Sequence, residues 1–198
     1  LKGFMGELDW LGTCQGMKLE NGLFWPVPIT LSATSDLADS IQIGQEVVLV
    51  DKEGDNLPMA VMTVTEKYQP NHDMECAAVF GTTDKAHPGV QKVMAQGPVN
   101  LAGNVIVFDE GEFPALFSNL YLRPEESRKM FRELGWRRVA AFQTRNPMHR
   151  SHEHLVKIAI DVTDGVFIHQ VLGKLKPGDI PADVRVHAID AMIRNYFA

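Results

Sequence analysis

Short apolar segments separated by turn residues fill the first part of the chain, up to about residue 122. Residues 58–68 alternate apolar and polar side chains, as a strand with one buried face does. Residues 41–50, interrupted at Gly44, and residues 105–108 are two further predicted strands. Short strands set between Gly, Pro, Asn and Asp predict a small mixed or barrel-like β domain.

The pattern changes near residue 123. Pro124 is suited to begin a helix and Gly135 to end it. Residues 139–142 form a continuous apolar run, which is typical of a strand buried on both faces of a parallel sheet, and residues 166–171 form a second predicted strand. Two more helices are predicted from apolar residues at helical spacing, at Leu155, Ile158, Ala159 and Val162 and again at Val186, Ile189 and Ile193.

The order helix, strand, helix, strand, helix predicts the beginning of a doubly wound α/β domain. We therefore expect two domains, a β domain at residues 1–122 and an α/β domain at residues 123–198. Both are expected to be parts of a longer protein, because the chain begins with Leu1 and its last residues fall within a predicted helix.

Amino-acid composition and net charge bear on which partners the protein is expected to bind. The chain has 198 residues, of which 45% are hydrophobic and 22% charged, and its formal net charge is −6. Broad electrostatic attraction to nucleic acid or to an anionic membrane is not expected at this charge, and no apolar run is long enough to cross a bilayer. Cys14 and Cys76 are far apart in the sequence and are predicted to be reduced, buried thiols of a cytoplasmic protein.

The candidate chemistry lies in residues 143–152, where a predicted buried strand ends and a helix begins. Ligands of open α/β sheets bind at the carboxyl ends of the strands. Asn146 followed by Pro147 predicts the helix start, with Asn146 as the cap and Pro147 at the first helical position. The backbone N–H groups at such a start form a site for an anion.

Side chains in this segment add further hydrogen-bond donors. His149 and His152 are three residues apart, so they share one face of the helix and can both donate to an oxygen that gains charge. Arg145 adds a planar guanidinium that matches a tetrahedral oxyanion. Gln143 and Thr144 add neutral donors.

Simpler interpretations of these residues stay open. A histidine pair at this spacing is often a surface or core feature, Arg145 can pair with a nearby carboxylate, and Asn146 can be only a cap. A zinc site is less well supported, because His-Glu-x-x-His is absent and His152 and His154 lie on different faces of a helix. We assign no metal ligand.

The sequence Ala-Phe-Gln-Thr-Arg-Asn-Pro-Met-His-Arg at residues 141–150, followed by a small residue and His152, resembles the signature of the ATP sulfurylases. Residues 24–31, 87–90 and 176–179 resemble other parts of that family, so the likeness covers nearly the whole chain. The resemblance implies an N-terminal PUA-like β-barrel domain. It also implies a partial Rossmann-like parallel α/β domain of the HxGH nucleotidyltransferase type.

The resemblance also implies a reaction and residue roles. Sulfate would attack the α-phosphorus of ATP, and pyrophosphate would leave with Mg²⁺, for which no protein ligand is assigned. Gln143 and Arg145 would bind sulfate, and residues 143–146 would line the ATP site. The catalytic residues would be Thr144, Arg145, Asn146, His149 and His152.

Some expectations concern the whole protein. The full-length protein is expected to be a cytoplasmic homo-oligomer without nucleic-acid or membrane partners. The family's second motif, Gly-Arg-Asp-His-Ala, does not occur here, so the activity of these residues alone stays open. Two alternatives also stay open: another adenylyltransferase of the same architecture, acting on a phosphorylated vitamin or nicotinamide mononucleotide, and a non-catalytic module that binds an anion or RNA.

Overall fold

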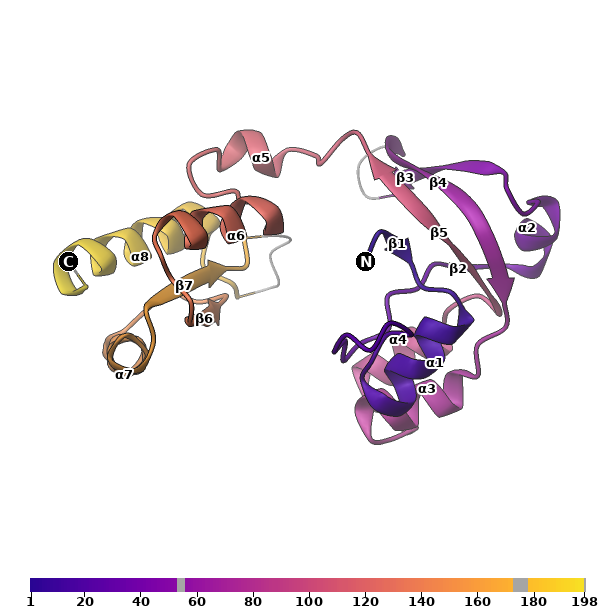
Figure 1. The fold of residues 1–198 in the computed structure, drawn as a ribbon, viewed down its shortest axis with the longest axis horizontal. Helices are drawn as coiled ribbons and strands as arrows, with labels where there is room; N and C mark the ends of the chain where they lie inside the picture. The colour runs from indigo at the N-terminus through magenta and orange to yellow at the C-terminus, as the bar shows by residue number, and fades with distance from the viewer. Residues whose placement is uncertain (53–55, 173–177, 198) are drawn as a thin grey trace. The chain divides into compact units, whose positions relative to one another are not determined.

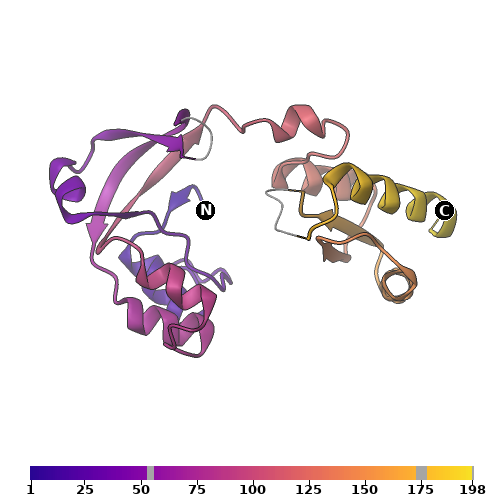
Figure 2. The same ribbon diagram turned by 180° about the vertical axis from the view of Figure 1, so that it is seen from behind.

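The computed structural model describes residues 1–52, 56–172 and 178–197. The chain divides into two compact units, Leu1–Ser118 and Asn119–Ala198. Each unit has its own sheet, antiparallel in the first and parallel in the second, as seen from opposite sides in Figures 1 and 2. The predicted change from a β-rich part to an α/β part is therefore present.

The first unit is built on a five-stranded sheet with the hydrogen-bonded order β1-β5-β4-β3, in which β2 also pairs with β5. The prediction of a strand at residues 58–68 is confirmed by β4, and residues 105–107 lie within β5. The strands of this sheet are β1 Gly3–Phe4, β2 Ser32–Ala33, β3 Glu46–Asp51, β4 Leu57–Tyr68 and β5 Val99–Val107.

The prediction of a strand across residues 41–50 was wrong in its first half, because β3 begins only at Glu46. Gly44 has a φ of +88°, which an extended strand cannot contain. Its N–H donates to the Val64 carbonyl at 2.7 Å, and the Val64 N–H donates to the Gln45 carbonyl at 2.9 Å. Residues 42–45 therefore form a turn against β4.

The helices of the first unit include three that gather near one end of the sheet, α1, α3 and α4 (Figures 1 and 2). The Trp10 ring of α1 lies 5.8 Å from that of Tyr68, and its Nε1 donates to Glu75 Oε2 of α3 at 2.7 Å. The helices of this unit are α1 Glu7–Gly16, α2 Ser35–Ser40, α3 His72–Phe80, α4 Pro88–Met94 and α5 Phe113–Leu116.

Both cysteines are buried free thiols, as predicted. Burial, with a smaller contribution from the Glu75 carboxylate, raises the pKa of Cys14 to about 12. Burial, with smaller contributions from the Glu75 and Asp73 carboxylates, raises the pKa of Cys76. Both thiols therefore stay protonated near neutral pH and act as small apolar side chains of the core.

The second unit contains two parallel strands, β6 Val139–Thr144 and β7 Gly165–Gln170, paired in register from Val139↔Gly165 to Thr144↔Gln170. Its helices are α6 Pro124–Glu133, α7 Arg150–Val162 and α8 Ala182–Tyr196. Both predicted strands and the helix predicted to begin at Pro124 are confirmed.

Side chains of β7 alternate between the two faces of this sheet, and helices cover both faces. Ile168 packs in a cluster with Val156 of α7 and Ile189 of α8. Phe167, the neighbour of Ile168 in the strand, makes an edge-to-face contact with Phe131 of α6 at 5.5 Å. Helices on both faces of a parallel sheet are the arrangement of a doubly wound α/β domain.

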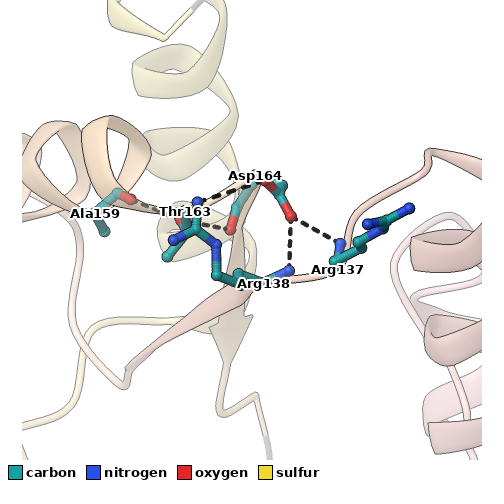
Figure 3. A network of polar contacts seen from close by, with 6 residues as sticks. Arg137, Arg138, Ala159, Thr163 and Asp164 are labelled. Atoms are coloured by element: carbon teal, nitrogen blue, oxygen red, sulfur yellow. Dashed lines mark hydrogen bonds and ion pairs between the residues drawn. The ribbon is translucent and has the colours of Figure 1, made fainter.

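A polar network joins the first ends of β6 and β7 (Figure 3). Oδ2 of Asp164 accepts the backbone N–H groups of Arg137 and Arg138 at 2.8 and 2.7 Å. The Asp164 N–H in turn donates to the Arg138 carbonyl at 2.9 Å. The Thr163 hydroxyl donates to the Ala159 carbonyl at 2.6 Å and so closes the last turn of α7. The network fixes the two strands at the end opposite to residues 143–146.

Among residues 1–52, 56–172 and 178–197, no helix is both long and apolar enough to cross a membrane.

Candidate active site

The helix after β6 begins three residues later than predicted. The N-cap is His149 and α7 begins at Arg150, so the predicted cap at Asn146 with Pro147 at the first helical position was wrong. The His149 Nδ1 accepts the N–H of Ser151 at 3.4 Å. The N–H of His149 itself donates to His152 Nδ1 at 3.2 Å, which completes a reciprocal capping box. Histidine side chains therefore occupy the capping role.

These caps fix which nitrogen of each imidazole carries the proton. A backbone N–H can only donate, so Nδ1 of both His149 and His152 must be an unprotonated acceptor. The Ser151 hydroxyl lies 2.8 Å from the same Nδ1 of His149. A neutral imidazole that accepts at Nδ1 carries its hydrogen on Nε2. Each ring therefore has an Nε2–H to donate to a ligand.

The two rings lie side by side, with their centroids 4.0 Å apart. His149 is exposed and His152 is half-buried, with its ring edge-to-face against Phe142 at 5.6 Å. Burial, and to a smaller extent the neighbouring His149, lower the pKa of His152. His152 is therefore neutral at pH 7, which agrees with its role as an acceptor at Nδ1.

Residues 144–146 form a closed turn directly after β6. The Thr144 Oγ1 accepts the Asn146 N–H at 3.0 Å, and its hydroxyl donates to the Asn146 carbonyl at 2.9 Å. A threonine that bonds the backbone two residues on stabilises a turn of this kind. The turn explains why the helix does not start at Asn146, whose backbone groups are engaged with Thr144.

Arg145 projects from this turn to a carboxylate that the sequence did not assign to the site. Its Nη2 donates to Asp179 Oδ2 at 2.6 Å, and both side chains are partly buried. The carboxylate partner that the simpler interpretation of Arg145 called for is therefore present. A charge-assisted bond of this length orients the guanidinium. Lys176, in the same loop, lies outside the described residues.

Gln143 lies in β6 directly beside His169 of β7. Its Nε2 is 3.1 Å from His169 Nδ1, and both side chains are exposed. His169 was not among the site residues predicted from the sequence. The in-register parallel pairing of two polar residues near the ends of their strands was the signal that would have placed His169 with Gln143.

The structure thus pairs His149 with His152, Gln143 with His169, and Arg145 with Asp179. Thr144 and Asn146 hold the turn between these groups. Neutral imidazole N–H groups, an amide and a guanidinium at the carboxyl end of a parallel sheet are suited to bind oxyanions and to stabilise charge that develops on them.

Arg185 of α8 is a further charged residue that sequence reasoning missed. Its Nη1 donates to the carbonyls of Arg145 and Val171, at 2.8 and 2.6 Å. The available signal was its place four residues before Ile189, on the helix face that packs against the sheet.

No group of three or more His, Cys, Asp or Glu side chains that could hold a metal ion occurs within the described parts of the chain. The donors at this site are those that bind anions rather than divalent cations.

Two family models match the chain. The model described as "PUA-like domain" matches residues 1–110, and the model described as "ATP-sulfurylase" matches residues 118–198. The expected PUA-like N-terminal part, followed by an α/β part of the ATP-sulfurylase type, is confirmed by these matches.

Curated relatives match the chain over its whole length. Proteins named sulfate adenylyltransferase from Chlorobium chlorochromatii and Syntrophobacter fumaroxidans are 60% identical over 197 residues and 58% identical over 198 residues. Each alignment covers 100% of this chain and 48% of the relative. The chain therefore spans about half the length of the curated relatives it matches.

A solved structure described as "Hexameric APS kinase from Thiobacillus denitrificans" is also similar. It has a TM-score of 0.64 and 25% sequence identity, and the match covers 100% of this chain and 34% of that chain.

Proposed function

Because the chain belongs to the ATP-sulfurylase family, we propose that it carries part of the active site of a sulfate adenylyltransferase. The enzyme would join sulfate to the α-phosphate of ATP, giving adenosine 5′-phosphosulfate and pyrophosphate. The observation that carries this proposal is the capped start of α7, where His149 and His152 each have an Nε2–H to donate beside the turn that holds Arg145.

The proposed reaction is a direct in-line displacement. A sulfate oxygen forms a bond to the α-phosphorus, the bond from that phosphorus to the bridging oxygen of the β-phosphate breaks, and pyrophosphate leaves with the electron pair. Atoms and charge balance without a protein nucleophile. The protein has to bring together two anions that repel one another and stabilise the charge that develops on the leaving oxygens.

Six residues between positions 143 and 152 have a proposed role in this step. Gln143 and Arg145 bind sulfate, and Asp179 orients the Arg145 guanidinium by the 2.6 Å bond. Thr144 and Asn146, which hold the turn together, line the ATP site with Gln143 and Arg145 and belong to the catalytic set.

The two histidines act on the charge that appears in the transition state. His149 and His152 donate from Nε2 to oxygens of the α-phosphate and leaving group. Neutral imidazoles suit this role because the bonds made at Nδ1 already hold the rings in place, so little reorganisation is needed during the reaction.

Several properties of the whole protein are part of the proposal. Mg²⁺ enters with ATP as part of the substrate, without an assigned protein ligand. We propose a cytoplasmic location, supported by the two buried free thiols, and a homo-oligomer, supported by the likeness to a hexameric solved structure. Domains at residues 1–122 and 123–198 also remain our proposal.

The test uses a chimera of this chain and the C-terminal half of the Chlorobium chlorochromatii relative, which is 60% identical to it over the shared part. We expect sulfate-dependent release of pyrophosphate from MgATP by the chimera. We expect His149→Ala to lower its turnover by roughly 10²-fold or more, as the loss of one such donor does elsewhere. Pyrophosphate release would be measured by a coupled assay.

The matched control is His154→Ala, which removes an exposed histidine from the same helix without touching the capping box. Its turnover should equal that of the unaltered chimera. Pyrophosphate release that does not depend on sulfate, or that responds instead to nicotinamide mononucleotide or a phosphorylated vitamin, would reject the proposed substrate. Tight, salt-sensitive RNA binding in a filter assay without turnover would favour the binding-module alternative.

A further inference from the structure

Arg185 is buried beneath the candidate site. It is 1% exposed and is the largest fully buried side chain among the described residues. Its Nη1 donates to the Arg145 carbonyl at 2.8 Å and to the Val171 carbonyl at 2.6 Å. Arg145 directly follows β6, and Val171 directly follows β7. The guanidinium therefore joins the two chain segments that leave the carboxyl ends of the parallel strands.

The charge of Arg185 is not balanced by a carboxylate in the described parts of the chain. Arginine stays protonated in proteins, so the buried group carries a full positive charge. Its Nε and Nη2 atoms are buried and have no hydrogen-bond partner among the described residues. Arg145, Arg138 and Arg194, by contrast, each form an ion pair with an aspartate. A buried cation compensated only by two carbonyl oxygens is unfavourable unless a negative charge comes close.

The position of Arg185 indicates where its missing negative counter-charge comes from. Arg185 contacts the backbone of Arg145, in the turn where an anionic ligand of a parallel sheet is expected. In a poorly solvated interior the charge acts on a nearby anion more strongly than it would in water. A polyphosphate at the turn would supply the missing counter-charge without touching Arg185 itself.

We propose, building on the function proposed above, that Arg185 is a positioning residue of a polyphosphate site at the ends of β6 and β7. It has two effects. The two bonds from Nη1 hold the Arg145 turn at a fixed distance from the segment after β7. The buried positive charge raises the affinity of the turn for the phosphates of ATP.

A purely structural role predicts something different. If Arg185 only held the fold together, its loss would weaken binding of charged and uncharged ligands alike. If its charge favours the anion, its loss weakens the binding of ATP far more than that of adenosine, which has the same base and sugar but no phosphate. The ratio of the two affinities therefore separates the two roles.

The experiment measures binding of ATP and of adenosine by titration calorimetry to the 198-residue chain and its Arg185→Met, Arg185→Lys and Arg194→Met variants. Arg194 is the matched control, because it is on the same helix but is exposed and paired with Asp190. We expect Arg185→Met to weaken ATP binding by roughly tenfold or more, with adenosine binding changed by less than about twofold. Arg185→Lys, which keeps the charge, should stay within about threefold for ATP, and Arg194→Met should match the unaltered chain.

Equal losses for ATP and adenosine in Arg185→Met, or an ATP affinity no lower than in Arg194→Met, would overturn the inference. If Arg185→Met does not fold, Arg185→Gln takes its place, since its amide can still donate to one carbonyl. If both neutral variants fail to fold while Arg185→Lys binds ATP normally, the charge of Arg185 is needed only for folding, and the inference is overturned. An unaltered chain that does not bind ATP at millimolar concentration would also overturn it.

Failure of this inference is distinct from failure of the proposed function. Sulfate-dependent turnover is measured in the chimera, whereas the affinity ratio is measured in the chain itself. ATP binding that depends on Arg185, without sulfate-dependent turnover in the chimera, would reject the function and keep the polyphosphate site. Sulfate-dependent turnover in the chimera, together with an unchanged ratio of ATP to adenosine affinity in Arg185→Met, would keep the proposed function and reject the role of Arg185.

Discussion

The side chains of His149 and His152 cap the start of α7 through Nδ1, and the same side chains are the candidate ligands of the site. Histidine is not among the preferred N-cap residues, which is why Asn146 was the natural sequence choice. The Thr144–Asn146 turn removes Asn146 from that role, and His149 takes it. The displacement matters for chemistry, because capping at Nδ1 leaves the Nε2–H groups of His149 and His152 as the available donors.

The pKa of His152 provides a test at the scale of one residue. Burial is the larger cause of its lowered pKa and His149 the smaller. In an NMR titration of the chain, we expect His152 to titrate below the ordinary histidine value of about 6.5. His149→Gln, which removes the neighbouring titratable ring but keeps a polar side chain, should raise that pKa only part of the way, since burial remains.

The lowered pKa of His152 also determines how the stability of the fold changes with pH. A histidine whose pKa is lower in the folded state binds fewer protons there, so protonation favours unfolding as the pH falls below about 6.5. Replacing His152 with Gln should therefore remove part of the decline in midpoint temperature between pH 7 and pH 5. A pKa above 7 would contradict both the neutral state at pH 7 and the assigned tautomer.

At the scale of elements, the second unit is fixed at both ends of its parallel strand pair. Asp164 binds the N–H groups of Arg137 and Arg138 at one end, and Arg185 binds the strand exits at the other. Parallel pairing brings residues that are distant in sequence into register. The geometry near Gln143 therefore depends on contacts made at the opposite end of the strands.

Asp164→Ala is expected to lower the midpoint temperature of the second unit by a few degrees at pH 7, because two backbone N–H groups lose their acceptor. The backbone N–H of Arg138, and next that of Arg137, lower the pKa of Asp164. The contribution of a carboxylate with a lowered pKa is present above its unfolded-state pKa and is lost as the pH falls through the folded-state pKa. The difference between variant and unaltered chain should therefore shrink in acid, as thermal unfolding followed by circular dichroism would measure.

Asp161→Ala is the matched control for Asp164, because Asp161 is an exposed acid near the negative end of α7. Its removal should leave the midpoint temperature unchanged or slightly raised. A pH-independent difference for Asp164→Ala would show that the charge of Asp164 is not what the two N–H groups require.

Some of these elements could be predicted from the sequence, and others could not. The strand pair β6–β7 and the start of α6 could be predicted, because a continuous apolar run is typical of a parallel strand and Pro124 suits a first turn. The prediction that residues 139–142 are buried on both faces was wrong, since none of them is buried and Ala141 is exposed. At Gly165, the first residue of β7, a Cβ would lie 2.4 Å from the Trp136 ring.

Other features depend on long-range contacts that no local pattern encodes. The apolar spacing in α7 predicted a helix, but the buried residue is Val156, whereas Leu155 and Ile158 are about half exposed. The partners of Arg145 and Gln143, Asp179 and His169, come from the loop after β7 and from β7 itself. These pairs arise from the parallel register and from the path of the chain after β7.

At the scale of the whole molecule, the buried clusters of the described residues each belong to one unit only. Three clusters contain residues of Leu1–Ser118, and one contains residues of Asn119–Ala198. Cooperative unfolding reflects shared packing, so separate cores predict separate transitions. The candidate site lies entirely in the second unit, and so does Arg185.

Trp10→Phe tests this independence. The change removes the indole N–H that donates to the buried Glu75 at 2.7 Å and leaves a carboxylate without that partner. We expect the free energy of unfolding of the first unit to fall by about 2–3 kcal/mol. The transition of the second unit should not move, because none of its cluster residues contacts Trp10. Calorimetry would resolve the two transitions. A shift of both transitions together would mean that the units unfold as one body, and then variants in the first unit would also alter ligand binding at the Arg145 turn.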